Sequence, residues 1–137
     1  MLKYEGDYLN GNGKEYNPFD NTLVYEGEYL NGEKHGKGKE YTNGKLLFEG
    51  EYKNGKKWNG KAYDINSNKI NEVKEGKGFI KEYFYGNKIK SEGEYLNGEK
   101  NGKGKEYNMD GLLIFEGEYK NGKKMEKENI TKIWKAF

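Results

Sequence analysis

The sequence contains no cysteine and no arginine, and it has one proline and one histidine. Without cysteine, the fold has no disulfide framework and no thiolate zinc site. All 25 basic residues are lysines, and 23 acidic residues leave a net charge of +2, which argues against a strong nucleic-acid interface. No apolar run approaches 18 residues, and no signal-peptide pattern is present. We therefore expect a cytoplasmic protein.

Aromatic residues and glycine are abundant. The chain of 137 residues has 13 Tyr, 6 Phe, 2 Trp and 21 Gly, although only 32% of its residues are hydrophobic. Such a low hydrophobic content by itself would suggest disorder. Aromatic side chains, however, bury a large area per residue and can hold thin sheets together. The length is that of one domain.

One phrase of five residues, close to Tyr-Glu-Gly-Glu-Tyr, recurs along the chain. Its central glycines are Gly6, Gly27, Gly50, Gly93 and Gly117, which lie 21, 23, 43 and 24 residues apart. The interval of 43 contains one degenerate copy, at residues 61–78. A period in the low twenties is typical of stacked structural repeats.

The copy at residues 25–44 has the pattern of an antiparallel hairpin. Alternation places aromatic residues and glycine on one face of a strand and glutamates on the other. Asn43-Gly44 predicts a two-residue turn, because both central positions require positive φ. We expect residues 30–35 to form a longer loop. Lysines of the second strand would then lie across from the glutamates of the first.

Residues 25–44, YEGEYLNGEKHGKGKEYTNG, resemble the MORN repeat, whose usual pattern is close to YEGEWxNGxxHGxGxY followed by an Asn-Gly or Asp-Gly turn. The likeness extends over about residues 4–124. In one departure, the second-strand aromatic residue follows the last glycine by three residues instead of two, as from Gly38 to Tyr41. This shift implies a bulge or a changed register. The chain also resembles a looser MORN variant of some bacterial antitoxin-like proteins.

These patterns predict an all-β fold with one elongated, single-layer antiparallel β-meander of stacked hairpins. The array would occupy residues 1–124, as about six repeats of which the one at 61–78 is degenerate. Residues 125–137 would form a short amphipathic helix that caps the array, because Ile130, Ile133, Trp134 and Phe137 are spaced as one helical face. The alternative is that this helix binds a membrane surface or a partner.

No catalytic set, metal site or cofactor site is predicted, so we expect a protein that is not an enzyme. Residues 64–68 partly match a calcium loop but lack its essential glycine, and we interpret them as a turn. Residues 36–38 and 102–104 resemble fragments of phosphate loops but open no helix. His35 has no catalytic partner in its neighbourhood of the sequence. The glutamates are matched by lysines, which indicates solvated cross-strand pairs.

The resemblance implies a role in scaffolding, in dimerisation, or in attachment to membranes or the cytoskeleton. We expect a non-catalytic scaffold that binds a protein partner, or a second copy as a homodimer, through an aromatic-lined sheet face. The residues proposed for this contact are Tyr25, Tyr29, Phe48, Tyr52, Tyr95, Phe115, Tyr119 and Trp134. The alternative reading of this row is that it only forms a core.

Two other functions remain open at this point. One is peripheral binding of acidic phospholipid membranes through lysines along one edge, namely Lys34, Lys37, Lys39, Lys56, Lys57, Lys100, Lys103 and Lys105. Interspersed glutamates weaken this alternative, because each cancels part of the attraction to an anionic surface. The other is an antitoxin-like protein that binds a toxin. In each case we expect a cytoplasmic location, peripheral to a membrane or to the cytoskeleton for some of these roles.

Overall fold

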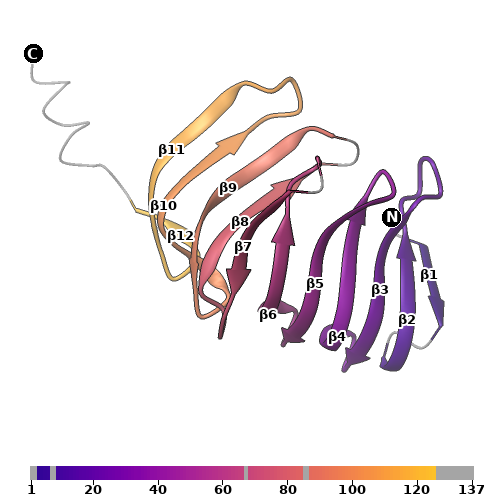
Figure 1. Ribbon diagram of the computed structural model, residues 1–137. Coiled ribbons are helices and arrows are strands. Elements are labelled where there is room, and N and C mark those ends of the chain that lie inside the picture. The colour runs from indigo at the N-terminus through magenta and orange to yellow at the C-terminus, as the bar shows by residue number, and fades with distance from the viewer. Residues whose placement is uncertain (1–2, 7–8, 67, 85–86, 126–137) are drawn as a thin grey trace, which may run out of the picture.

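The computed structural model describes residues 3–6, 9–66, 68–84 and 87–125. Within these residues the chain forms strands and no helix, and the strands follow one another in chain order along the molecule (Figure 1). They are β1 (Lys3–Gly6), β2 (Asn10–Tyr16), β3 (Leu23–Leu30), β4 (Glu33–Thr42), β5 (Lys45–Lys53), β6 (Lys56–Tyr63), β7 (Lys69–Val73), β8 (Gly78–Tyr83), β9 (Ile89–Leu96), β10 (Glu99–Tyr107), β11 (Leu113–Lys120) and β12 (Lys123–Lys124). The predicted all-β fold is confirmed. Of the predicted capping helix, only Met125 lies within the described residues.

The strands form two antiparallel sheets, β1–β7 and β8–β12, and the second is turned relative to the first (Figure 1). The prediction of one continuous layer is therefore wrong. Between β7 and β8 the only strand-type pairing in the described chain is a bridge from Lys74 to Lys77. Val73 and Ile80 stand opposite Gly60 and Gly93 in the ladder, at positions where other repeats have glycine. Both side chains are buried, so the two strands separate around them.

The turns after β3, β5, β9 and β11 are tight. Asn31 and Gly32 have φ of 53° and 79°, as a two-residue hairpin turn with both central residues left-handed requires. The predicted loop over residues 30–35 is wrong, because β3 ends at Leu30 and β4 begins at Glu33. Asn43-Gly44 forms the predicted turn, with φ of 47° and 75°.

Successive turns are joined by hydrogen bonds, and we call this row the turn spine. The N–H of Gly55 donates to the carbonyl of Lys34 at 2.9 Å, and Gly122 donates to Lys100 at the same distance. At the junction of the sheets, Gly76 donates to Trp58 at 2.8 Å and its carbonyl accepts from Gly98 at 2.9 Å. The spine thus continues where the strand ladder stops.

The second strands β4, β6 and β10 contain extra residues, as the spacing predicted, whereas β2 pairs with β1 and β3 without them. Gly38 pairs with Gly27 but Lys34 pairs with Tyr29, so residues 35–37 bulge opposite Glu28. As a result, Glu40 lies opposite Tyr25 and Phe48, and cross-strand partners share a face. We call the face with Tyr25 and Phe48 the inner face and the opposite face the outer face.

Candidate functional site

The aromatic row that the sequence suggested for partner binding lies on the inner face and is mostly buried. Tyr25 and Phe48 are 0% exposed, and Tyr29, Tyr52 and Tyr119 are buried as well. The rings of Tyr25, Tyr29, Phe48 and Tyr52 contact one another edge to face at centroid distances of 5.3–5.4 Å. Tyr95 and Phe115 are half-buried, and Trp134 lies outside the described residues. The buried members of the row form the core, with Tyr95 of the second sheet packed against it.

Glycines make room for these rings. A Cβ atom at Gly38 would lie 2.7 and 2.8 Å from two ring carbons of Tyr25, and one at Gly60 would lie 2.7 Å from Cζ of Phe48. A Cβ atom at Gly104 would lie 2.8 Å from Cε1 of Tyr119. An aromatic ring of a neighbouring strand therefore packs directly against the recurring glycine of the second strand.

Carboxylates also project from the inner face, which the sequence analysis missed. Tyr29 Oη donates to Oε1 of Glu15 at 2.6 Å, and Glu15 is only 5% exposed. Tyr119 donates in the same way to Glu106. The prediction of solvated glutamates is wrong for these residues. Alternation from the paired glycine was the available signal, because Glu40 lies two residues after Gly38 and shares its face if no bulge falls between them.

The tyrosine and glutamate pairs recur in the second sheet, where Tyr95 donates to Glu82 as Tyr119 does to Glu106. One pair differs from this pattern. Tyr52 faces Glu40, but its buried hydroxyl makes no hydrogen bond of standard geometry. Burial and the nearby carboxylate of Glu40 raise the pKa of Tyr52 well above its usual value, so the phenol stays protonated.

Lysines complete the inner-face network. Nζ of Lys34 and Nζ of Lys57 each lie 3.3 Å from an oxygen of Glu40, and Nζ of Lys34 also lies 4.8 Å from the centroid of the Tyr25 ring. Burial by itself raises the pKa of Glu40, but Lys57 and Lys34 outweigh it and lower the pKa to about 2. In the second sheet, Lys124 lies 3.3 Å from Glu106.

This inner-face network holds its charges fixed. A carboxylate with a pKa near 2 does not exchange protons at neutral pH, and burial raises the pKa of Tyr25 and Tyr29. The groups are therefore suited to an electrostatic and structural role. On the outer face, lysines and glutamates form exposed pairs as predicted, such as Lys39 with Glu49 at 3.3 Å.

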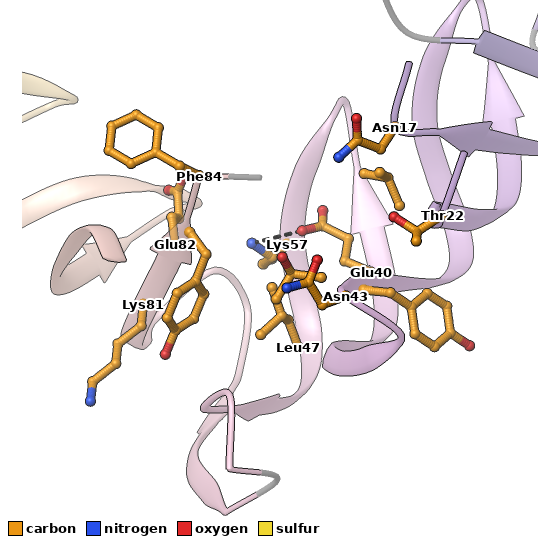
Figure 2. Close-up of a pocket in the computed structure, with 13 residues that line it drawn as sticks. Asn17, Thr22, Glu40, Asn43, Leu47, Lys57, Lys81, Glu82 and Phe84 are labelled. Atoms are coloured by element: carbon orange, nitrogen blue, oxygen red, sulfur yellow. Dashed lines mark ion pairs between the residues drawn. The ribbon is translucent and has the colours of Figure 1, made fainter. Parts of the chain in front are cut away.

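A small polar cavity lies between the sheets (Figure 2). Its volume is about 120 Å³. The ion pair of Lys57 with Glu40 borders one side, and Glu82 and Phe84 border another. Asn17, which also lines it, is 4% exposed. A space of this size and polarity suits a few water molecules, each of which occupies roughly 30 Å³.

The other motifs considered from sequence have structural partners. Oδ1 of Asp64 accepts the N–H groups of Asn66 and Asn68, so this carboxylate closes its own turn. The N–H of Lys37 donates to Oε2 of Glu28 at 2.5 Å, which places a carboxylate of the chain where a phosphate would bind. Among the described residues, no group of three or more His, Cys, Asp or Glu could hold a metal ion.

His35 contributes to the turn spine. Its Nδ1 accepts the N–H of Asn54 at 3.4 Å, and Oδ1 of Asn101 accepts the N–H of Asn121 at 3.3 Å in the equivalent place. The lone histidine thus has a contact within the repeat array.

A second aromatic row lies on the outer face, and we call it the outer tyrosine row. Each of its tyrosines is half-buried, and most stand opposite an aliphatic residue of the next strand. Its members are Tyr16 opposite Leu23, Tyr41 opposite Leu46, Tyr63 opposite Lys69, Tyr83 opposite Ile89 and Tyr107 opposite Leu113. Tyr107 Oη donates to Oε1 of the outer-face residue Glu92 at 3.2 Å.

The lysines considered for lipid binding do not share one edge. Lys34, Lys57 and Lys100 lie over rings of the inner face, with Nζ of Lys100 5.4 Å from the Tyr119 centroid. Lys37 and Lys39 lie on the outer face opposite glutamates of β5. Among the described residues, no helix is long and apolar enough to cross a membrane.

Stacked hairpins, ring-bearing glycines and turns that bond to one another define a β-hairpin repeat array. The family model of the MORN repeat matches residues 25–45, 48–58, 92–112 and 115–127. The chain is a MORN-repeat protein. The matches at 25–45 and 92–112 begin in β3 and β9 and run through the following strands, β4 and β10. A comparison with curated proteins found no match.

Proposed function

We propose that this protein is a non-catalytic scaffold that binds a protein partner through the outer tyrosine row. MORN repeats are in general associated with protein-binding or membrane-binding scaffolds. The observation that carries the proposal is the outer row itself, in which half-exposed tyrosines recur at one position of successive repeats beside leucine or isoleucine. Tyrosine is well suited to such contacts, because it combines a large apolar area with a polar end.

The inner face is a poorer contact surface. Its largest rings, those of Tyr25 and Phe48, are fully buried, so a partner would have to open the core to reach them. The cost of exposing such side chains is about 1.5–3 kcal/mol each, before any new contact is made. Tyr95 and Phe115 are the accessible exceptions.

Binding to acidic lipids is less well supported. The lysines face opposite sides of the sheet, and several of them form ion pairs, such as Lys56 with Glu99 at 2.8 Å. A membrane surface would attract only the lysines of one face, and the alternating glutamates of that face would cancel much of this attraction. An antitoxin-like function is a special case of the present proposal, in which the partner is a toxin.

The test compares the full-length protein with the double variant Tyr41→Ser and Leu46→Ser. Partners captured by the wild type in high salt are purified, and their dissociation constants are measured. We expect the double variant to bind at least tenfold more weakly, because it removes one tyrosine and leucine pair from the row. Leu30→Ser is the matched control, since Leu30 is 44% exposed but lies at the turn end of β3.

Flotation with vesicles that contain anionic lipid tests the alternative. Flotation at low salt that is lost at physiological salt would favour an electrostatic membrane binder. Equal affinity of the double variant and the wild type for the partner would refute the outer row as the contact surface.

A further inference from the structure

An apolar patch lies at the end of the array, and we call it the terminal patch. Its members are Met109, Leu112, Leu113 and Ile114, which are 58%, 63%, 50% and 59% exposed. Four consecutive or nearly consecutive apolar side chains at this exposure are unusual for a surface that contacts only water. They are contributed by the turn before β11 and by the first residues of β11.

The corresponding residues in the middle of the array are covered. Leu113 and Ile114 occupy the positions of Leu46 and Leu47, because Leu46 pairs with Tyr41 as Leu113 pairs with Tyr107. Leu46 and Leu47 are half-buried, and Leu47 lines the cavity between the sheets. The repeat thus places apolar residues here for contact with a neighbouring element, and at β11 the described residues leave them exposed.

Within the described part of the chain, the strand that follows β11 does not cover the patch. There β12 pairs only with Tyr119 and Lys120, and the N–H of Met125 donates to the carbonyl of Glu118 at 2.8 Å. Counted from the Asn-Gly turn, Lys127 falls at the position of Gly60. A Cβ atom at Gly60 would lie 2.7 Å from Cζ of Phe48. The sequence therefore has a lysine where β6 has a glycine that makes room for a ring.

Residues 126–137 have the composition to cover the patch in another form. Ile130, Ile133, Trp134 and Phe137 recur at the spacing of one helical face. Glu128 near the beginning and Lys135 near the end of such a helix would both favour its dipole. Twelve helical residues span about 18 Å. Ile114 lies four residues before Glu118 along β11, or about 14 Å, so the segment can reach the patch from Met125.

We propose that residues 126–137 dock as an amphipathic helix on the terminal patch and close the open end of the array. Ile130, Ile133, Trp134 and Phe137 face Leu113 and Ile114 in this arrangement. Trp134 is then engaged within the chain and is not a contact for a partner. The terminal patch shares Leu113 with the outer tyrosine row. Docking of the segment is nevertheless measured without any partner, so this inference is tested independently of the proposed function.

The absence of cysteine allows a clean test in the full-length protein. Spin labels are attached at Asp110→Cys, in the turn beside the patch, and at Lys135→Cys, which lies off the apolar helical face. The distance between them is measured by double electron–electron resonance. We expect one narrow distribution centred below about 30 Å, because a docked helix of about 18 Å stays beside the turn.

Ile114→Lys should broaden this distribution, because it places a charge in the apolar contact. Leu96→Lys is the matched control: Leu96 is 42% exposed in the same sheet, at the other end of its strand, and the distribution should not change. A broad distribution in the parent protein, or an unchanged one in Ile114→Lys, would overturn the proposal. Loss of the short distance on dilution with unlabelled protein would also overturn it, since the contact would then join two copies.

Discussion

Replacing Glu40 by glutamine removes a negative charge that lies between two ammonium groups. Lys34 and Lys57 are each 3.3 Å from this carboxylate, and the three side chains are only 24%, 16% and 21% exposed in the order Lys34, Lys57, Glu40. Glu40→Gln preserves the size of the side chain but leaves two poorly solvated lysines without their counter-charge. We expect a large loss of stability that depends on pH.

The magnitude follows from the pKa of Glu40, which is lowered from 4.5 to about 2 in the folded protein. A difference of this size corresponds to about 3 kcal/mol. Because the folded pKa is the lower one, this stability is fully present above about pH 5 and is lost as the pH falls through 2. The difference between the wild type and Glu40→Gln should therefore be about 3 kcal/mol at pH 7, about half of that at pH 3 and close to zero near pH 2.

Urea unfolding followed by circular dichroism, at intervals from pH 7 to pH 2.5, measures this difference directly. Glu51→Gln is the control, because Glu51 is exposed on the outer face of the neighbouring strand β5. It should change stability by less than about 0.5 kcal/mol. If Glu40→Gln differs from the wild type by the same amount at pH 7 and pH 3, the fixed-charge interpretation of the inner face is refuted.

Substitutions at three further positions test the repeat. Gly38→Ala places a methyl group within 2.8 Å of the fully buried Tyr25 ring, so the free energy of unfolding in urea should fall by about 1–3 kcal/mol. An unchanged free energy would contradict the role of this glycine in making room for the ring. Tyr29→Phe removes the donor at 2.6 Å from buried Glu15 and should cost about 1–3 kcal/mol in the same assay, whereas a neutral result would show that the bond contributes little. His35→Asn should retain the midpoint of thermal unfolding, because Asn101 accepts the equivalent hydrogen bond in the second sheet, and His35→Ala should lower it by a few degrees. The reverse order would refute the role of His35 in the turn spine.

The sequence was sufficient for the repeat and for its strands, because these depend on local rules. Asn-Gly pairs force a left-handed turn wherever they occur, and alternation assigns the residues of a first strand to faces. The error over residues 30–35 came from reading the polar stretch as one loop, although its Asn31-Gly32 pair is the same turn signal as Asn43-Gly44.

The composition of the inner face could not be predicted, because a bulge can lie on either side of the paired glycines. Placed after Gly38, it would leave Glu40 outside and Tyr41 inside. Placed before Gly38, at residues 35–37, it gives the observed arrangement. Only the position of the bulge distinguishes a buried network of Glu40 and its lysines from a solvated one. In the structure the carboxylate of Glu28 accepts a hydrogen bond from the bulged backbone.

The division into two sheets could not be predicted from the sequence pattern either. It depends on whether β7 and β8 can approach each other around Val73 and Ile80, which is a matter of packing volume. The degenerate copy at residues 61–78 was recognised from its spacing. That it interrupts the ladder follows only from the three-dimensional arrangement.

The turn spine has a mechanical consequence at this interruption. Elsewhere in the array, a pull along its long axis is resisted by the many parallel hydrogen bonds between neighbouring strands. Between the sheets of the described chain there is no strand ladder, and the contacts that join them include the bridge of Lys74 with Lys77, the bonds that Gly76 makes to Trp58 and Gly98, and the ion pair of Lys56 with Glu99. We expect a stretched molecule to yield there first, as a hinge between two stiffer segments, so a protein held at both ends would open at this joint before any repeat unravels.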